Sequence, residues 1–474
     1  MRTAGTALLA GGLLLSLASG TPAARLEWRG GLELDGRRES FGFASLFDAG
    51  GIAVEGDSAA VRYRERQLEV LALAGLSLRP SRLAGSSGID LEARAGPTRR
   101  ALTLDGGWSF AGVTARNRFL ADDDESDTGR LRSAQNLLQL TWSPPPGPSW
   151  RPALRGACDL SWADTDAGAD TLAAVNAEYL RYQRASAGLG VLHGAYGEGR
   201  LFLDVSRKWA GRDTRGACAS YVLAAQQSTV RLTGGLDLEL RAERRRYLDS
   251  APDTLDGALT SYREAEAYAR WRQAGALWGW EASARMTGLL YDGTPAASDT
   301  SDAAALAALN ADRLQLETAC LVRRPLLGDP LEVQSMTGGG RVTLECGVGL
   351  VGDQLWVRQS TGEYHALGVR WEGSLRGGPR WGETWLDIVA EGGRRDYRDG
   401  KDALGFDFEG LSLSLAQSDY SYLSGSIIGG GRIARGIEWQ IYASLDAEWH
   451  KASVDDARLF AVDLTLLKRW GPAR

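Results

Sequence analysis

Residues 230–245 read VRLTGGLDLELRAERR, and apolar and ionised residues alternate through this stretch one by one. A period of two residues is that of a β-strand, because successive side chains point to opposite faces of a sheet. Strands of this kind recur along most of the chain, so we expect an all-β protein. We use parity for the set of alternate residues that share one face of a strand. In a soluble sandwich the polar parity faces bulk water. In a transmembrane barrel the polar parity faces a wet lumen and the apolar parity faces lipid.

The same alternation predicts further strands at residues 88–96, 262–272, 277–291, 313–323, 364–375, 382–393, 437–449 and 458–470. Each is long enough to cross a hydrocarbon layer, which takes about 9–11 tilted residues. Counting from about residue 60 predicts about 18 strands, with a range of about 16–20. No stretch after residue 17 has the roughly 20 apolar residues of a spanning helix, and the mean hydropathy is -0.24. The prediction is a single antiparallel transmembrane β-barrel over residues 58–474.

The N-terminal residues have the pattern of a secretory signal. Met1 and Arg2 precede an apolar run at residues 7–17, and small residues follow at 18–20, where a signal peptidase would cut. We therefore expect residues 1–20 to be a signal peptide. Residues 21–57 fit the barrel least well: residues 25–35 alternate and would add a strand, while the Gly-rich residues 39–54 would insert into the lumen.

Connections between the strands fall into two classes, as expected for a barrel with short periplasmic turns and long external loops. The predicted turns are residues 96–100, 143–149, 195–199, 273–276, 376–379 and 432–436. The predicted loops are residues 121–129, 163–171, 249–257, 293–302, 397–418 and 451–456. Indole rings prefer the bilayer interface, and tryptophans close to the predicted turns suggest an inner girdle formed by Trp142, Trp271, Trp278, Trp371, Trp439 and Trp470.

The composition supports a long strand-and-turn protein: 474 residues with 60 Gly, 16 Trp, 14 Tyr and 3 Met. The net charge is -6, and no basic stripe indicates nucleic acid. Cys158, Cys218, Cys320 and Cys346 are widely separated, so they do not suggest a metal site. A disulfide between Cys320 and Cys346 stays open, and no cofactor is expected.

The ionised parity supplies the candidate pore lining, because charged rows facing a water-filled pore order solutes and set ion preference. These candidates are Arg231, Asp237, Glu239, Arg241, Glu243, Glu264, Glu266, Tyr268, Arg270, Arg272, Glu438, Asp446 and Glu448. We expect arginines on one strand to face acids on the next. The alternative is a lumen filled by salt bridges. The apolar loop at 397–418 would either fold inward as a constriction or form an extra hairpin above the membrane.

Catalytic chemistry is poorly represented. Only His193, His365 and His450 are available, and no serine motif accompanies His365 on its lipid-facing parity. His450 near Asp455 and Asp456 is a weak approach to a protease-like pair. Asp122, Asp124 and Ser126 have part of a calcium-loop spacing without its glycine and glutamate. We therefore expect no enzyme and no metal site.

The strand pattern resembles bacterial outer-membrane β-barrel proteins of porin-like type, including a last strand at 458–470 with alternate apolar residues and a terminal aromatic. The resemblance implies a channel for passive diffusion of small polar solutes or ions in the outer membrane of a Gram-negative-type bacterium. It also implies contact with outer-membrane lipid, lipopolysaccharide and the barrel-insertion machinery. Small-residue rows such as Ala265, Ala267 and Ala269 would permit a homo-oligomer. The alternatives are a surface-interaction barrel with a closed lumen and, third, a barrel-type membrane hydrolase.

Overall fold

The structure is a computed structural model. It describes residues 24–44, 60–80, 88–126, 129–144, 150–166, 181–194, 197–210, 217–231, 234–248, 261–275, 277–292, 312–327, 343–357, 363–377, 384–398, 404–408, 411–415, 419–434, 437–450 and 457–470. The expected signal peptide lies outside these residues. In this part of the chain, no helix is long and apolar enough to cross a membrane.

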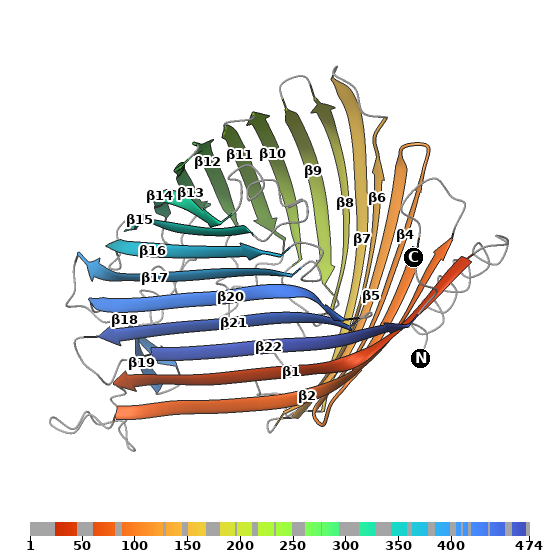
Figure 1. Ribbon diagram of the computed structural model, residues 1–474, viewed down its shortest axis with the longest axis horizontal. Helices are drawn as coiled ribbons and strands as arrows, with labels where there is room; N and C mark the ends of the chain where they lie inside the picture. Colours follow the sequence, from red (N-terminus) through yellow and green to blue (C-terminus); the bar gives the residue numbers. More distant parts are fainter. Residues whose placement is uncertain are drawn as a thin grey trace.

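Twenty of the described strands form one closed antiparallel sheet (Figure 1). Each strand pairs with its neighbour in the chain, and β1 pairs with β22 to close the barrel. The strands of the first half are β1 (Ala24–Ala44), β2 (Ala60–Pro80), β3 (Gly88–Ala95), β4 (Arg99–Phe110), β5 (Val113–Ser126), β6 (Gly129–Trp142), β7 (Arg151–Thr165), β8 (Tyr182–His193), β9 (Glu198–Ala210) and β10 (Cys218–Arg231).

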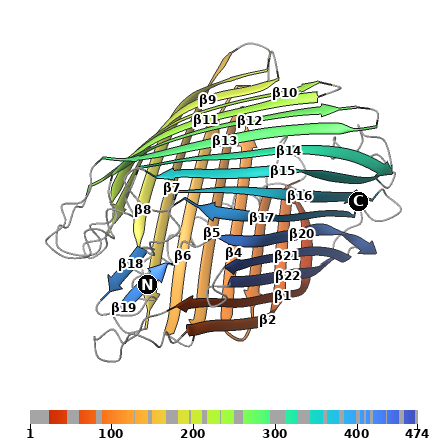
Figure 2. The same cartoon turned by 90° about the vertical axis from the view of Figure 1, so that its left-hand side faces the viewer.

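The second half follows the same up-and-down order. Its strands are β11 (Gly234–Tyr247), β12 (Tyr262–Ala274), β13 (Gly279–Tyr291), β14 (Arg313–Leu327), β15 (Thr343–Val357), β16 (Tyr364–Arg376), β17 (Trp385–Tyr397), β20 (Tyr420–Ala434), β21 (Ile437–His450) and β22 (Ala457–Trp470). Figure 2 shows the barrel turned by 90°. The all-β antiparallel barrel expected from the sequence is therefore confirmed, and residues 24–44, before the point where the strand count began, form its first strand.

The barrel has 20 strands rather than about 18, and two features account for the difference. The first is β1, which the count from residue 60 left out. The second is a turn at Ala111 and Gly112, which divides β4 from β5 and has positive φ angles of 50° and 82°. Two such angles define a tight hairpin turn whose twist matches the flanking strands. The surrounding sequence, SFAGVT, gives little turn signal, so one strand was predicted where there are two.

The barrel has a turn end, where β1 begins and β22 finishes, and a loop end opposite. Long connections at 166–181, 248–261, 292–312 and 398–419 lie at the loop end, whereas the short connections at 111–112, 194–197, 232–233, 275–278 and 435–436 lie at the turn end. One long connection, at 328–342, also lies at the turn end. Two expectations were wrong. The connection at 96–98 lies at the loop end, because the missed hairpin reverses the direction of β3 and β4. The acidic residues predicted as a loop at 121–129 continue β5 as far as Ser126.

The stretch 230–245 spans two strands instead of one. Val230 and Arg231 end β10, and β11 begins at Gly234. The turn at 232–233 is so short that the apolar alternation continues in sequence across it. In the register of the two strands, Arg231 pairs with Gly234. Gly234 lies on the same face of β11 as Leu236 and on the opposite face from Asp237. The assignment of Arg231 to the ionised face was therefore wrong, and its side chain lies outside the described part of the structure.

The two faces of the sheet differ in chemistry. Large exposed apolar side chains lie mainly on the outer face, such as Leu240 and Leu350, each 59% exposed, and Leu367, 64% exposed. Leu71 and Leu321, each 1% exposed, lie on the opposite face. A continuous exposed apolar surface of this extent is expected of a protein in contact with lipid.

Between β17 and β20 the chain forms a separate two-stranded hairpin of β18 (Leu404–Phe408) and β19 (Leu411–Leu415). The hairpin lies at the loop end (Figure 1). Its strand β19 comes close to β1, even though the three strands β20, β21 and β22 lie between β17 and β1 in the sheet. A hairpin therefore forms within residues 397–418, and its inward position as a constriction stays a prediction.

Candidate pore lining

The ionised parity lies on the concave face of the sheet. Arg323 on β14 contacts Glu372 on β16 at 2.6 Å, and Arg395 on β17 lies 3.5 Å from Asp353 on β15. Each contact passes over one intervening strand, and strands are spaced about 4.8 Å apart. Side chains converge in this way where the sheet curves toward them, so this face is the inner wall.

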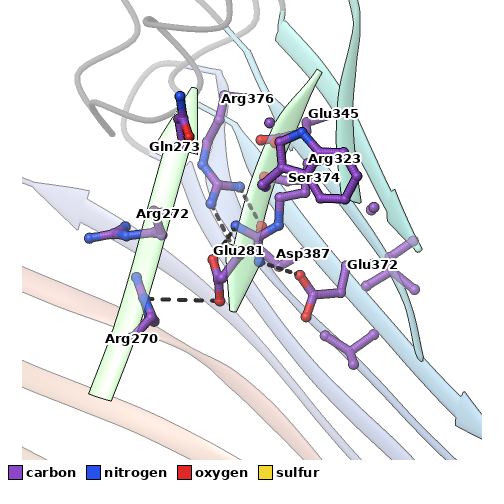
Figure 3. A pocket seen from close by; sticks show the side chains of 16 residues that line it. Arg270, Arg272, Gln273, Glu281, Arg323, Glu345, Glu372, Ser374, Arg376 and Asp387 are labelled. Carbon is purple, nitrogen blue, oxygen red and sulfur yellow. Dashed lines mark hydrogen bonds and ion pairs between the residues drawn. The ribbon is translucent and has the colours of Figure 1, made fainter. Parts of the chain in front are cut away.

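A belt of ion pairs crosses the inner wall from β11 to β17 near the turn end. Arg323 lies at its centre, with Glu281 at 2.9 Å on one side and Glu372 at 2.6 Å on the other (Figure 3). Arg270 lies 3.9 Å from Glu281 and 3.7 Å from Asp237. The carboxylates therefore share their guanidinium partners, which holds neighbouring strands together.

The belt borders a cavity of ≈ 290 Å³. Arg272 extends the belt to Asp237 at 3.1 Å, and Arg376 extends it to Asp387 at 2.8 Å. Glu345 also lines this cavity (Figure 3). A recess lined by both signs of charge suits small polar or charged solutes better than apolar ones.

A second group of charges lies between β7 and β12. Arg155 on β7 forms an ion pair with Asp204 on β9 and stacks over the Phe202 ring at 4.1 Å. Arg155 and Phe202 line a cavity of ≈ 200 Å³ together with Glu239, Arg241 and Glu266. This part of the wall therefore also presents ionised groups to the interior.

Near the loop end, tyrosines replace ion pairs as the main lining. The Tyr364 and Tyr397 rings lie 5.6 Å apart, and Tyr397 lies 6.4 Å from Tyr420. The Arg395 guanidinium lies 4.1 Å from the Tyr364 ring centre. The Tyr364 hydroxyl donates to Asp353 at 2.8 Å. Cation–π contact and hydrogen bonding thus fix Arg395 among the tyrosines.

Apart from Arg231, every predicted pore-lining residue has the inward parity. Most of the contacts they make are with other polar residues of the same face: Gln226 donates to Glu239 at 2.9 Å, and Arg285 contacts Glu266 at 3.1 Å while covering Tyr268 at 5.4 Å. Arg241 and Glu243, both predicted, contact each other at 2.5 Å. On β21, Ser424 donates to Asp446 at 2.6 Å, His450 lies 3.4 Å from Glu448, and Arg469 contacts Glu438 at 2.6 Å. Glu264 pairs in register with Glu243.

The predicted arrangement of arginines facing acids on the next strand holds only in part. Asp237 stands opposite Arg270 and Arg241 opposite Glu266, but Glu243 stands opposite Glu264. Glu243 instead pairs with Arg241 and Arg245 of its own strand, at 2.5 and 2.8 Å. Ion pairs along one strand were not anticipated, although an Arg-x-Glu-x-Arg spacing in the sequence could have indicated them.

Sequence reasoning missed Arg323, Glu281, Arg155 and Arg395. Arg323 and Glu281 lie in strands that were predicted, at residues 313–323 and 277–291, so extending the parity argument to these strands would have found them. The signal for Arg395 is weaker, because its strand was predicted to end at residue 393. Its aromatic partners come from β16, β17 and β20, which only the closed sheet brings together.

Tryptophans mark both rims of the outer face. At the turn end, Trp271, Trp278 and Trp470 are 47%, 48% and 53% exposed, and Trp142 and Trp439 share the outward parity there. Trp371 also faces outward, but it lies further from the turn end, five residues before the end of β16 at Arg376. A second row at the loop end was not predicted: Trp162, Trp209, Trp356 and Trp449.

The distance between the two rows fits a bilayer. Trp439 and Trp449 lie on the same face of β21, ten positions apart. A rise of about 3.3 Å per residue and a tilt of about 40° place them ~25 Å apart along the barrel axis, which is the height of the apolar band in outer-membrane barrels. The outer face therefore has the dimensions of a membrane-spanning surface.

Within the described strands, the candidate catalytic histidine His365 lies apart from any nucleophile in register with it. His365 is 67% exposed on the outer face, 3.8 Å from Asp396; Gln354 is its other register neighbour, so a nucleophile stands at neither position. The Trp150 and His193 rings lie 4.4 Å apart. Asp455 and Asp456, proposed as partners of His450, lie outside the described residues.

The partial calcium-loop spacing at Asp122, Asp124 and Ser126 lies in strand β5, where Asp122 pairs with Arg99 at 2.9 Å. Among the residues that the structure describes, no three acidic, histidine or cysteine side chains gather as metal ligands. The four cysteines are free. Cys320 stands opposite Leu350, so it does not face Cys346 in the paired strands.

A closed antiparallel sheet with an apolar outer face, two tryptophan rows and a charged inner face defines the class: a transmembrane β-barrel of porin-like type. No family model matches the sequence, and no curated protein matches it.

Solved structures similar to this chain include three proteins of Pseudomonas aeruginosa. OpdL has a TM-score of 0.43 and 10% identity, covering 95% of this chain and 99% of its own. OccK2 (OpdF) has a TM-score of 0.42 and 10% identity, covering 96% and 99%. OprD has a TM-score of 0.41 and 8% identity, covering 96% and 97%. The class rests on the geometry of this chain and not on these likenesses.

Proposed function

We propose that this protein is an outer-membrane channel for the passive diffusion of small polar solutes or ions. The observation that carries the proposal is the contrast between an inner wall lined by ionised groups and an outer face lined by exposed apolar groups. A channel of this kind needs no cofactor and no catalytic group, because the solute gradient drives transport.

The size of the barrel favours an open lumen over a packed one. Barrels of 16–18 strands already leave an aqueous channel, because the diameter grows with strand number. With 20 strands, side chains from the wall alone would not meet across the middle. The ion pairs of the described residues also lie along the wall, within one strand or between strands at most two apart in the sheet, and do not bridge opposite sides.

Purified protein inserted into planar bilayers tests the proposal. A water-filled lumen predicts steady single-channel steps whose size rises with salt concentration. Folded protein that stays silent over a wide range of voltages would favour the closed-lumen alternative, a barrel that acts through its external surface. Heat-modifiable migration on gels is the check that the inserted protein is folded.

The β18–β19 hairpin is expected to narrow the channel mouth. We predict that replacing residues 400–417 by a short Gly-Ser linker raises the single-channel conductance, since Tyr397 and Asp419 already lie side by side with a 2.9 Å hydrogen bond. Deleting residues 295–310, from another long connection at the same end, is the control. Equal conductance of the hairpin deletion and the intact protein would show that the hairpin lies clear of the pore.

Export by the N-terminal signal, recognition of β22 by the insertion machinery and homo-oligomer formation stay predictions of the sequence. The turn end would face the periplasm, because short turns at one end and long loops at the other are the usual arrangement in the outer membrane. The loop end would then lie in the outer leaflet.

A further inference from the structure

Ionised residues on the outer face are distributed unevenly between the two rims. Among the described residues, the turn end carries Arg324 and Lys468. The loop end carries many more: Arg100, Asp123, Glu125, Arg130, Arg132, Asp164, Arg207, Arg244, Arg246, Arg263, Arg394, Asp396 and Arg458. A charge at the rim of a barrel is close to the lipid headgroups, so the loop end presents many more charged groups to them than the turn end does.

The densest positive cluster comes from β9, β11 and β12. Arg207 and Arg246 both pair in register with Ala219 of β10, so they flank one strand on the same row, about 10 Å apart. Arg244 precedes Arg246 by two positions on the same face, and Arg263 stands directly opposite Arg244. Four guanidinium groups therefore occupy one small area of the outer rim.

These side chains reach the surface. Arg244 and Arg263 are 57% and 60% exposed. Asp292 contacts both, at 3.7 and 2.9 Å, which fixes the two guanidinium groups beside each other. Among the described side chains one carboxylate lies with the four arginines, so this group of side chains carries a net positive charge.

Apolar and aromatic side chains continue the same face toward the middle of the membrane. Tyr221, 50% exposed, stands opposite Arg244. Leu203 and Leu240 are 53% and 59% exposed. Toward the loop end, beyond the arginines, the Trp209 ring centre lies 5.6 Å from Arg207. The patch is therefore amphipathic: cationic at the rim and apolar below it.

We propose that this patch binds the phosphate groups of lipopolysaccharide in the outer leaflet, with the acyl chains against Leu203, Tyr221 and Leu240. Guanidinium groups bind phosphate oxygens through paired, charge-assisted hydrogen bonds, and the row spacing lets separate arginines engage more than one phosphate. The inference rests on the proposed placement of the loop end in the outer leaflet. It does not depend on whether the lumen conducts.

Native mass spectrometry of the detergent-purified full chain tests the proposal with three probes: bisphosphorylated lipid A, dephosphorylated lipid A and phosphatidylglycerol. We expect bisphosphorylated lipid A to bind best. Combining Arg207→Gln with Arg246→Gln should weaken its binding at least about tenfold, because two charge-assisted contacts are lost. Arg324→Gln, a lipid-facing arginine at the opposite rim, should leave binding unchanged.

Three results would overturn the site: equal binding of dephosphorylated lipid A, equal binding of phosphatidylglycerol, or unchanged binding by the double variant. If the double variant fails to fold, Arg246→Gln alone is measured in its place. Bilayer conductance of the same preparations separates this inference from the proposed function. Lost lipid binding with intact conductance is the result expected of the double variant, while a silent protein that still binds lipid A would contradict only the channel.

Discussion

Replacing Leu445 by arginine is expected to destabilise the folded barrel in a membrane. Leu445 lies on the outer face of β21, near the middle of the stretch between Trp439 and Trp449, and is 40% exposed. An arginine at the midplane of a lipid-facing strand costs about 2–4 kcal/mol. Urea titration of the variant folded into liposomes should show this loss in the free energy of unfolding.

The adjacent residue provides a matched control. Ser444 has the inward parity, so Ser444→Arg places the same charge one position away but in water. We expect a change of less than about 1 kcal/mol, as for other substitutions away from packed or paired groups. If both variants lost the same stability, or if Ser444→Arg lost more, the assignment of the two faces would be wrong.

The second large effect is expected at Arg323. Its side chain is 28% exposed, and its partners Glu281 and Glu372 are 10% and 23% exposed. Arg323→Met would leave these carboxylates, and Glu345 nearby, without their shared cation. Losing one partner of a buried pair costs about 3–5 kcal/mol, and partial exposure reduces this to about 2–4 kcal/mol, measurable by the same urea titration.

Two further variants separate charge from packing. Arg285→Met removes a more exposed pair, 3.1 Å from Glu266 with 47% exposure of the arginine, and should cost less than about 1 kcal/mol. Adding Glu281→Gln to Arg323→Met should restore part of the loss, because one unpaired charge disappears. No recovery in the double variant would mean that Arg323 acts through its packing alone.

The sequence predicted the barrel well because alternation is a local property of each strand. The parity of β12, β21 and β22 follows directly from their residues, and the closed sheet bears it out. Errors arose where two strands meet without a turn signal, as at Ala111–Gly112 and at residues 232–233. There the hydrophobic pattern continues through the turn, and the strand number and the place of Arg231 were both misread.

The sequence could predict, from parity, which charged residues face the lumen, but it could not predict which of them form ion pairs with each other. Which charges meet depends on the stagger of neighbouring strands, and a shift of two residues keeps the parity but changes every pair. Glu243 therefore shares a face with Glu264 as expected, yet pairs with Arg241 and Arg245. The contact of Arg323 with Glu372 also depends on the curvature of the closed sheet, which no single strand encodes.

Thiol accessibility along β21 tests the two-faced barrel most directly. In a background with the four native cysteines replaced by alanine, single cysteines are placed in turn at residues 440–447 and treated with a membrane-impermeant, water-soluble thiol reagent in liposomes. The account predicts labelling at the even positions, which line the lumen, and protection at the odd positions, which face lipid. Labelling at 441, 443, 445 and 447 with protection at the even positions would contradict it.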